Sequence, residues 1–411
     1  MSETDPMNID ERRKYLQRMW ERYHYASKAD KTMLLDEMEA VTGMHRKSII
    51  RLMKGRRCRK KRERERGRAY GTEVEDALRV IARSLDYPCA ERLQPYLVWM
   101  AVQLSAHGEL VVTSKTLEAL GRISISTVKR MLRRIGPKTE KIASIQPKRP
   151  RGNSLRRQYP MSRIAWDIAE AGHLEVDLVH HCGASVRGEY IYTLQWVDVA
   201  SGWCEIFPIF GRGFLVMRDA FEYLHQRIPF PVNEFHPDNG DEFFSQFLLR
   251  YFEDKLPEVH ISRSRPFQKN DNRYVEENNH SLVRAYLGDA RYDTVSQLAV
   301  LRQLHQKLWL YHNFFQPMMK VKAKEYVEPL KYRRKFDTAQ TPFDRLVQME
   351  CLGEATQTEL ENLRQSIDPL ALRDEIEQLI MELSVLPCAE PGAKINVYDT
   401  LIMKEEAAEL Q

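Results

Sequence analysis

The sequence predicts a multidomain protein of the α plus α/β class, with helical regions at both ends and a mixed sheet in the middle. Three observations support this prediction. The chain of 411 residues exceeds the size of one ordinary domain. The first third and the tail repeat apolar residues at helical spacing, whereas the middle alternates strand-like and helical stretches. A basic stretch with Pro, Gly and Ser over residues 147–164 separates the two patterns and indicates a linker.

The composition is that of a soluble chain from a reducing compartment. Charged residues make up 29% of the sequence and the net charge is +5. The six cysteines are scattered without a CxxC pair, which favours free thiols over a disulfide framework. The charged N-terminus lacks the apolar stretch of a secretory signal, and the longest apolar run, YLVWMAVQL, is too short to span a membrane. We therefore expect a cytoplasmic protein that has no membrane segment.

Residues 1–68 are expected to form a helical DNA-binding domain. Apolar residues share one helical face, Gly43 makes a turn, and a short second helix with a basic start follows. The apolar face is formed by Leu34, Leu35, Met38 and Val41. This is the outline of a helix-turn-helix, and a plain helical hairpin explains the pattern equally well. Arg46 and Lys47, at the start of the second helix, are the candidate DNA contacts.

The end of this first region is strongly basic. Residues 55–68 hold nine Arg or Lys residues against two Glu residues. Such a run is typical of an arm that binds phosphates, and the alternative is a solvated helix that carries many charges. The candidate DNA contacts in this arm are Arg56, Arg57, Lys60 and Lys61.

A second helix-turn-helix outline is expected within residues 69–146. Two leucines precede a turn at Gly121, and either Ser124 or Ser126 can cap the helix that follows. That helix exposes a row of basic side chains, which makes it a second candidate recognition helix. Its candidate DNA contacts are Lys129, Arg130 and Arg133.

Residues 165–290 predict a mixed α/β domain in which helices cover a sheet. HLEVDLVHHCG, EYIYTLQWVDVA and GWCEIFPIF are strand-like, and FLVMRDAFEYLHQRI is helical. A strand before PDNG, the helix SQFLLRYFEDKL, the strand EVHISRSRPF and the helix RYVEENNHSLVRAYLG complete the order. In the first strand, Glu175, Asp177 and Val179 face away from the apolar side.

Three acids of this domain are candidates for one site. Asp177 lies within an apolar strand, where a charge is costly unless it is paired or bound to a metal. Asp238 follows the next central strand in a turn, where ordinary turn chemistry is the alternative explanation. At about 100° per residue, Glu276 lies on a flank of its helix that can reach the sheet, whereas Glu277 faces solvent. The buried stripe of that helix is predicted to hold Val275, Leu282 and Tyr286.

HLEVDLV, PDNGDEF and RPFQKNDNRYVEENN, in this order, resemble the three acidic motifs of DDE transposases and retroviral-type integrases. The spacing of 38 positions between Asp238 and Glu276 is close to that of the family. DLVHHCG, GEYIYTLQWVDVASGW and SRPFQKND look like the branch of bacterial insertion sequences. The resemblance covers residues 165–290 and implies an RNase H-like fold and an integrase catalytic core.

The chemistry implied by the resemblance explains why three carboxylates are needed. Two divalent ions about 4 Å apart can activate a nucleophile and stabilise the leaving oxygen of a phosphodiester. Mg²⁺ and Mn²⁺ favour carboxylate oxygen and leave room for phosphate and water. By resemblance, Asp177 would bridge two such ions, and Asp238 and Glu276 would each hold one.

Several positions depart from the family pattern. Retroviral integrases carry an N-terminal His-His-Cys-Cys zinc module, and its spacing is missing here, so we predict no structural zinc. The run HHC at 180–182 would place its ligands on alternate strand faces, which argues against zinc there too. Some integrases place a Lys one turn after the catalytic Glu, where this chain has His280. The nearby candidates for the DNA contact are Lys269, Arg273 and Arg284.

Other acids of the core are expected to be structural or solvated. Asp198, in WVDVASG, is predicted to be a structural residue beside a turn rather than a metal ligand. Asp241 and Glu242, in PDNGDEF, are expected to face solvent.

The C-terminal part is predicted to be mostly helical. Residues 291–353 hold a helix and then a basic stretch that forms either a small β module or an extended arm, and residues 354–411 hold two amphipathic helices. The resemblance implies a bacterial transposase that binds element ends and target DNA as a homo-oligomer and is nucleoid-associated when bound. Two alternatives remain: an RNase H-like nuclease that does not join DNA, and a non-catalytic DNA-binding regulator derived from a transposase.

Overall fold

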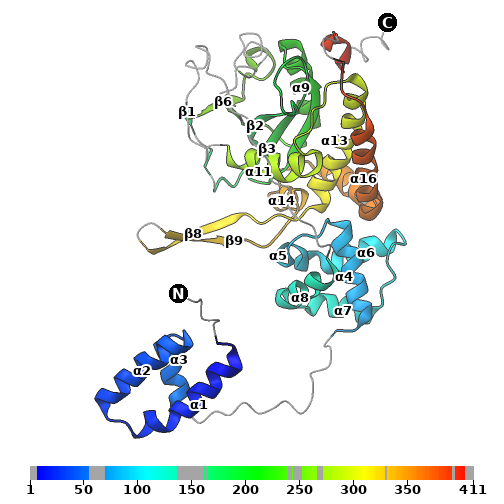
Figure 1. The fold of residues 1–411 in the computed structure, drawn as a ribbon. Helices are drawn as coiled ribbons and strands as arrows, with labels where there is room; N and C mark the ends of the chain where they lie inside the picture. The colour runs from blue at the N-terminus through cyan, green and yellow to red at the C-terminus, as the bar shows by residue number, and fades with distance from the viewer. Residues whose placement is uncertain are drawn as a thin grey trace. The chain divides into compact units, whose positions relative to one another are not determined.

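The structure is a computed structural model, and it divides into two compact units, residues 1–69 and 70–411 (Figure 1). The residues that it describes are 7–54, 70–136, 161–162, 164–165, 167–238, 243, 252–265, 272–328, 331–390 and 394–402. The basic arm at 55–68 and nearly all of the linker at 147–164 lie outside these ranges.

The first unit contains three helices around one small core. They are α1 (Ile9–Tyr25), α2 (Lys28–Thr42) and α3 (Arg46–Met53). α2 ends at Gly43, whose φ of 62° is left-handed and lets the chain turn into α3. The core is formed by Leu16, Met19, Leu34, Leu35, Met38, Ile49 and Met53. The helix-turn-helix outline is present, but Val41 is exposed rather than buried with the other apolar residues of α2.

The second unit begins with a helical segment. Its helices are α4 (Thr72–Ser84), α5 (Ala90–Leu93), a 3-10 turn (Gln94–Tyr96), α6 (Leu97–Ala106), α7 (Ser114–Arg122) and α8 (Ile125–Ile135). Ser124 is the cap of α8, because its hydroxyl accepts a hydrogen bond of 3.3 Å from the Thr127 N–H. The prediction of a turn at Gly121 is wrong, because Gly121 lies inside α7. The turn comes at Ile123 and Ser124, which take extended conformations.

This helical segment packs on the C-terminal helices of the same unit. The Tyr311 hydroxyl donates to the Ser84 carbonyl at 2.8 Å, and Arg83 pairs with Asp374 at 2.9 Å. Gln103 donates to three carbonyls around residues 364–367. The expected ranges 69–146, 165–290, 291–353 and 354–411 therefore meet within one compact unit, and their independence as domains stays a prediction.

A five-stranded mixed sheet forms the centre of the second unit. Its strands are β2 (His173–His180), β3 (Ile191–Asp198), β4 (Cys204–Phe210), β5 (Glu234–Pro237) and β6 (His260–Ile261). Their order is β4-β3-β2-β5-β6, with antiparallel pairing on the β4–β3–β2 side and parallel pairing from β2 to β6. This confirms the predicted mixed sheet with flanking helices.

The expected strand over EVHISRSRPF is divided. After β6, Ser262 donates its hydroxyl to Glu234 at 2.5 Å and leaves the ladder. The chain then forms β7 (Arg263–Ser264), which pairs in parallel with β1 (Met161–Ser162). Most of the helix expected at 245–256 lies outside the described residues. Within that range, residues 252–255 are described and are helical.

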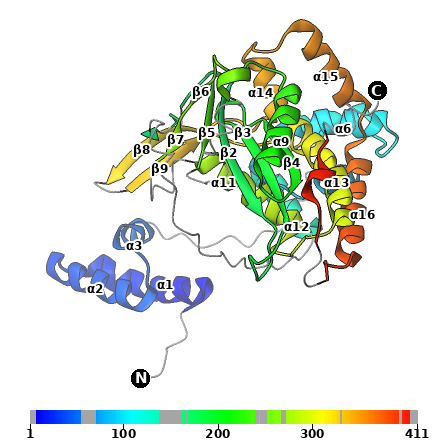
Figure 2. The same ribbon diagram turned by 90° about the horizontal axis from the view of Figure 1, so that it is seen from above.

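Helices cover both faces of the sheet (Figure 2). On one face, Phe221 of α9 (Phe214–Arg227) packs against Trp196 of β3 with ring centroids 4.8 Å apart. On the other face lie α11 (Arg273–Asn278), which packs on β2 and β3, and α13 (Val295–Phe315). His305 of α13 bonds Thr193 of β3 at 2.9 Å.

The helix predicted from residue 273 onward is not regular. α11 passes into η3 (Asn279–Arg284), a π-helical segment, and then into α12 (Ala285–Leu287). A π-helical turn holds more residues than an α-helical turn, so the predicted phase of 100° per residue applies only before Asn279. Val275 and Leu282 are buried as predicted, whereas Tyr286 is only half-buried.

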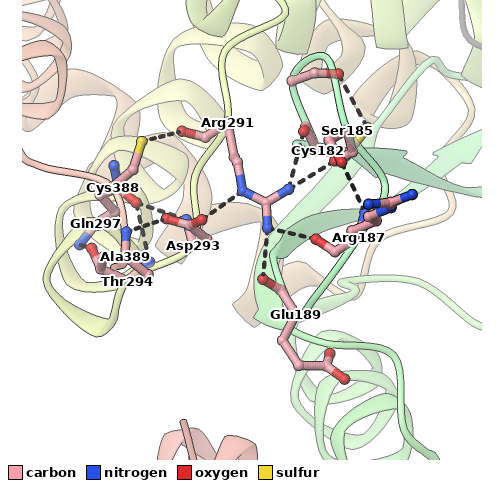
Figure 3. A network of polar contacts seen from close by, with 11 residues as sticks. Cys182, Ser185, Arg187, Glu189, Arg291, Asp293, Thr294, Gln297, Cys388 and Ala389 are labelled. Atoms are coloured by element: carbon pink, nitrogen blue, oxygen red, sulfur yellow. Dashed lines mark hydrogen bonds and ion pairs between the residues drawn. The ribbon is translucent and has the colours of Figure 1, made fainter. Parts of the chain in front are cut away.

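One arginine orders the connection between β2 and β3 (Figure 3). The Arg291 guanidinium pairs with Asp293 at 2.5 Å and donates to four backbone carbonyls. These belong to Cys182, Ser185, Arg187 and Glu189, at 2.8 to 3.3 Å. These hydrogen bonds therefore hold the loop that follows the C-terminal end of β2.

The C-terminal part confirms the predicted small β module. β8 (Val321–Glu328) and β9 (Lys331–Phe336) form an antiparallel hairpin. It is followed by α14 (Pro342–Gln348), α15 (Glu354–Ser366), α16 (Pro369–Val385) and a 3-10 turn (Val397–Thr400). None of the helices that the structure describes has the length and apolar character needed to cross a lipid bilayer.

Candidate active site

The pairing of β2 with β5 brings two of the three predicted acids together. The strands run in parallel, and their register extends from His173 beside Glu234 to Val176 beside Pro237. The next position on each strand is Asp177 and Asp238. Neighbouring strands lie about 5 Å apart, so these two carboxylates start from adjacent backbone positions where β5 ends.

Asp177 is tied to the helical segment that carries the third acid. Its side chain is buried, with 5% exposure. One carboxylate oxygen accepts a hydrogen bond of 2.9 Å from the Leu178 N–H, and the other accepts one of 2.6 Å from the Asn279 amide. Because Asn279 follows Glu276 by three positions, it lies on nearly the same side of the helix. This contact brings the Glu276 turn to β2.

Glu175 is a residue of the site that the sequence reasoning did not select. Its carboxylate is buried and accepts hydrogen bonds from the Tyr274 N–H at 2.7 Å and the Val275 N–H at 2.9 Å. N–H groups in the first turn of a helix have no partner within the helix, so a carboxylate there stabilises the helix start. Glu175 thus anchors α11 one residue before Glu276. The alternation in HLEVDLV, which places it on the same strand face as Asp177, was the signal available.

The pKa of Glu175 is raised to about 7, and burial is the main cause of this rise. The two backbone donors and the Arg273 guanidinium lower the pKa, and the charge of Glu276 makes the smallest contribution, which raises it. The Glu276 and Glu277 side chains are both exposed.

The described residues contain no group of three His, Cys, Asp or Glu side chains close enough to hold a metal ion as they stand. Asp177 and Asp238 are brought to adjacent positions and Glu276 to the neighbouring helix, without a closed ligand shell. The donor set itself fits a hard divalent cation, because all three candidates offer carboxylate oxygen and two of them come from parallel strands at one edge.

The basic candidates near this edge differ in how they are used. The Arg284 guanidinium donates to the His180 carbonyl at 2.6 Å and pairs with Asp289 at 3.3 Å, so it holds η3 against β2. Arg273 lies over the Tyr274 ring at 4.5 Å, beside the acids. His280 is exposed, and Lys269 lies outside the described residues.

The candidates in the helical units are also placed. The Arg46 guanidinium contacts Asp36 and the Thr32 carbonyl on α2, whereas Lys47 is exposed. On α8, Lys129 pairs with Glu91 at 3.7 Å, Arg130 donates to the Thr127 hydroxyl at 3.1 Å, and Arg133 is exposed. Arg56, Arg57, Lys60 and Lys61 lie outside the described residues. Their DNA contacts stay predictions.

Asp198 is the structural residue beside a turn that the sequence predicts. Its carboxylate accepts hydrogen bonds from the Gly172 N–H at 2.8 Å and from the Ser201 N–H and hydroxyl at 2.7 and 2.6 Å. Asp241 and Glu242 lie outside the described residues.

In the HHC run, successive side chains have different neighbours. His180 contacts the Tyr190 hydroxyl at 3.1 Å, and His181 contacts the Thr193 hydroxyl at 2.8 Å inside the core. Cys182 begins the loop that Arg291 holds.

Comparison with known proteins finds a sequence relative and a likeness to solved structures. No family model matches the chain. A protein named "Uncharacterized protein y4rM", from Sinorhizobium fredii (strain NBRC 101917 / NGR234), is 32% identical over 307 residues, which cover 74% of this chain and 86% of that protein. Among solved structures, the catalytic core domain of BIV integrase is similar with a TM-score of 0.29 and 16% identity, over 44% of this chain and 97% of that chain.

Proposed function

This chain belongs to the same family as the uncharacterized protein y4rM of Sinorhizobium fredii, and we propose that it is a DDE-type transposase that cuts and joins DNA. The observation that supports the proposal is the parallel register of β2 and β5, which ends at Val176 beside Pro237, one residue before Asp177 on one strand and Asp238 on the other. The three acidic motifs, read from the sequence, and the RNase H-like order of the strands support the same reaction class.

The acids have separate origins in the fold, and this suits phosphoryl transfer. Asp177 is rigid because it lies within a central strand and accepts two hydrogen bonds. Asp238 directly follows the end of β5. In this proposal, the sugar-phosphate backbone of DNA approaches the site at that end of the strand. Glu276 comes from α11, whose start is held by Glu175.

Asp177, Asp238 and Glu276 would hold Mg²⁺ or Mn²⁺, which when bound supplies a Lewis acid for the attacking and leaving oxygens. The chain's own residues orient the site. Asn279 fixes one oxygen of Asp177, and the Glu175 contact to the backbone of Tyr274 sets the position of Glu276. Arg273, beside these acids, is suited to contact a phosphate oxygen.

The helical units would recognise the ends of a mobile element. In the α2–α3 and α7–α8 outlines, exposed Lys47 and Arg133 lie on the second helix of each pair, which is the helix that enters the major groove in helix-turn-helix proteins. DNA is therefore the proposed partner, and a homo-oligomer bound to two ends is the proposed assembly.

The test uses the full chain and a supercoiled plasmid that carries the DNA segments flanking its gene. In Mg²⁺, we expect nicking at the element ends and joining of those ends to a second plasmid. Asp177→Asn, Asp238→Asn and Glu276→Gln should each abolish both reactions while DNA binding persists, because phosphate contacts elsewhere position the DNA. Glu277→Gln is the matched control and should retain activity.

Each result has a distinct meaning. Retained cleavage in one of the three variants removes that residue from the site. Cutting without joining would identify a nuclease, and binding without cutting would identify a regulator.

The choice of metal provides a further test. Mg²⁺ and Mn²⁺ should support cleavage, whereas Ca²⁺ should support DNA binding only, because its longer and looser coordination misplaces the reacting oxygens. Equal turnover in Ca²⁺ would contradict a compact site of this kind.

A further inference from the structure

The hairpin formed by β8 and β9 extends away from the sheet and helices of its unit (Figures 1 and 2). Its two strands pair from Val321 beside Phe336 to Glu328 beside Lys331. Among the described residues it forms a sheet of two strands, β8 and β9. Most such ribbons are marginally stable alone, so its shape depends on how its base is held.

The base of the ribbon is held by hydrogen bonds and an ion pair. Lys320 and Asp337 exchange hydrogen bonds of 2.7 and 2.9 Å, and Met318 and Gln340 form a second pair at 2.9 and 3.0 Å. The buried Arg345 guanidinium pairs with Asp337 at 2.7 Å. These contacts fix the direction in which the ribbon leaves the unit.

The base also lies beside the candidate active site. The buried Lys320 ammonium contacts the Val199 and Ala200 carbonyls and lies 5.0 Å from the centre of the Tyr274 ring. Tyr274 is the residue whose N–H donates to Glu175 at the start of α11. The Lys320 side chain at the base of the ribbon therefore lies against Tyr274 of α11, the helix that carries Glu276.

The ribbon is basic and exposed. Its strands contain six Lys or Arg residues against two Glu residues. Lys322 on β8 and Arg333, Arg334 and Lys335 on β9 are exposed, and Lys335 pairs with Glu325 across the ribbon.

We propose that the β8–β9 ribbon is an arm that binds duplex DNA next to the candidate active site. A two-stranded ribbon fits the major groove of B-DNA, and Lys and Arg residues along it can neutralise phosphates on both sides of that groove. The choice of DNA as the partner rests on the proposed function. The arm adds a grip beside the reacting phosphates, at a distance along the chain from the helix-turn-helix outlines.

The test measures the salt dependence of binding by the full chain to short duplex DNA, without metal, so that no cleavage occurs. Lys322→Gln/Arg333→Gln removes two charges from the ribbon. Arg218→Gln/Lys394→Gln removes the same charge from exposed positions outside it. The slope of log Kobs against log salt should fall by about 1 for each phosphate contact that is lost, so by about 2 in the ribbon variant. The control variant should keep the wild-type slope.

Equal slopes in the two variants would overturn the ribbon inference alone, provided that the wild type binds DNA and Asp177→Asn still abolishes cleavage. A wild type that does not bind duplex DNA would overturn the proposed function together with the ribbon. Stronger competition by polyglutamate than by duplex DNA would assign the arm to an acidic protein instead.

A folding defect is separated by a charge-preserving variant. Lys322→Arg/Arg333→Lys should restore the wild-type slope if the charges act on phosphates. Failure to restore it, with the same melting temperature as the wild type, would contradict a purely electrostatic grip.

Discussion

Six acids on or beside the central sheet fall into two groups with different surroundings. We call Asp198 and Glu205 the partnered acids, and Glu175, Asp177, Asp238 and Glu276 the clustered acids. Burial raises the pKa of both partnered acids, and donors from the chain act against this rise. Glu205 accepts from the indoles of Trp203 and Trp309 at 2.9 and 2.7 Å and pairs with Arg227 at 3.3 Å.

The clustered acids stand near one another as well as near donors. Asp177 and Asp238 follow each other in the register of adjacent strands, and the charge of Glu276 raises the pKa of Glu175. Burial alone is therefore no sign of a reactive site, since Asp198 and Glu205 are more deeply buried than Asp177. What distinguishes the clustered acids is that they come from adjacent segments of the fold, where a bound cation or a proton relieves repulsion between carboxylates.

The largest expected effect is a contrast between one aspartate from each group. Asp177→Asn should lower the rate of DNA cleavage about a thousandfold, because it removes a cation ligand that stabilises the transition state by several kcal/mol. Asp198→Asn should leave the rate per folded molecule unchanged and lower the free energy of unfolding by about 1–3 kcal/mol. Plasmid nicking measures the cleavage rate, and urea denaturation measures the free energy of unfolding. An equal loss of rate in both variants would contradict the division into two groups of acids.

The second effect concerns the stability of a partnered acid. Glu205→Gln should lower the free energy of unfolding by about 3 kcal/mol, because Arg227 loses its carboxylate in a largely buried setting. Asp177→Asn should change this free energy by less than about 1 kcal/mol, since it also removes repulsion among acids. Urea denaturation followed by tryptophan fluorescence compares them. A larger loss in Asp177→Asn would show that Asp177 is held for stability.

Glu175 shares features of both groups, and its variants sharpen the comparison. Glu175→Ala should lower the cleavage rate about 10–100-fold, as expected for a residue that positions a ligand, with little change in the KM for DNA. Glu175→Gln should recover much of that loss, because its amide oxygen can accept from the Tyr274 and Val275 N–H groups. A Gln variant as slow as the Ala variant would show that the charge, and not the anchor, matters.

The last prediction concerns pH and involves two buried histidines of α13, away from both groups of acids. Burial lowers the pKa of His305 and of His312 to about 4. The unfolded chain binds these protons below about pH 6.5, while the folded chain stays neutral down to about 4. Stability should therefore fall as pH decreases through this window, by about 1.4 kcal/mol per pH unit for each histidine.

Denaturant unfolding at several pH values measures this slope. His305→Gln/His312→Gln should flatten it between pH about 6.5 and 4. An unchanged slope in that variant would place the acid sensitivity elsewhere, for instance among the clustered acids.

The sequence by itself determined the types and order of the main elements. Alternating apolar residues in HLEVDLV and EYIYTLQWVDVA predicted β2 and β3, and helical spacing predicted α9, α13, α15 and α16. These patterns reflect contacts within a strand or a turn, so they can be read from neighbouring residues. The three acids were selected through the resemblance of their motifs, which can also be read from neighbouring residues, and their role stays a prediction.

Only the tertiary structure decided how these pieces meet. The register that sets Asp177 beside Asp238, the anchor of α11 on Glu175 and the contact of Asn279 with Asp177 join residues 61 to 102 positions apart. The π-helical segment after Asn278 altered the phase expected for Tyr286. Its first residue, Asn279, and its last, Arg284, both donate hydrogen bonds to β2. Likewise α7 continues past Gly121 to Arg122. Local propensities differ by less than about 1 kcal/mol per residue, so packing among distant segments outweighs them at such positions.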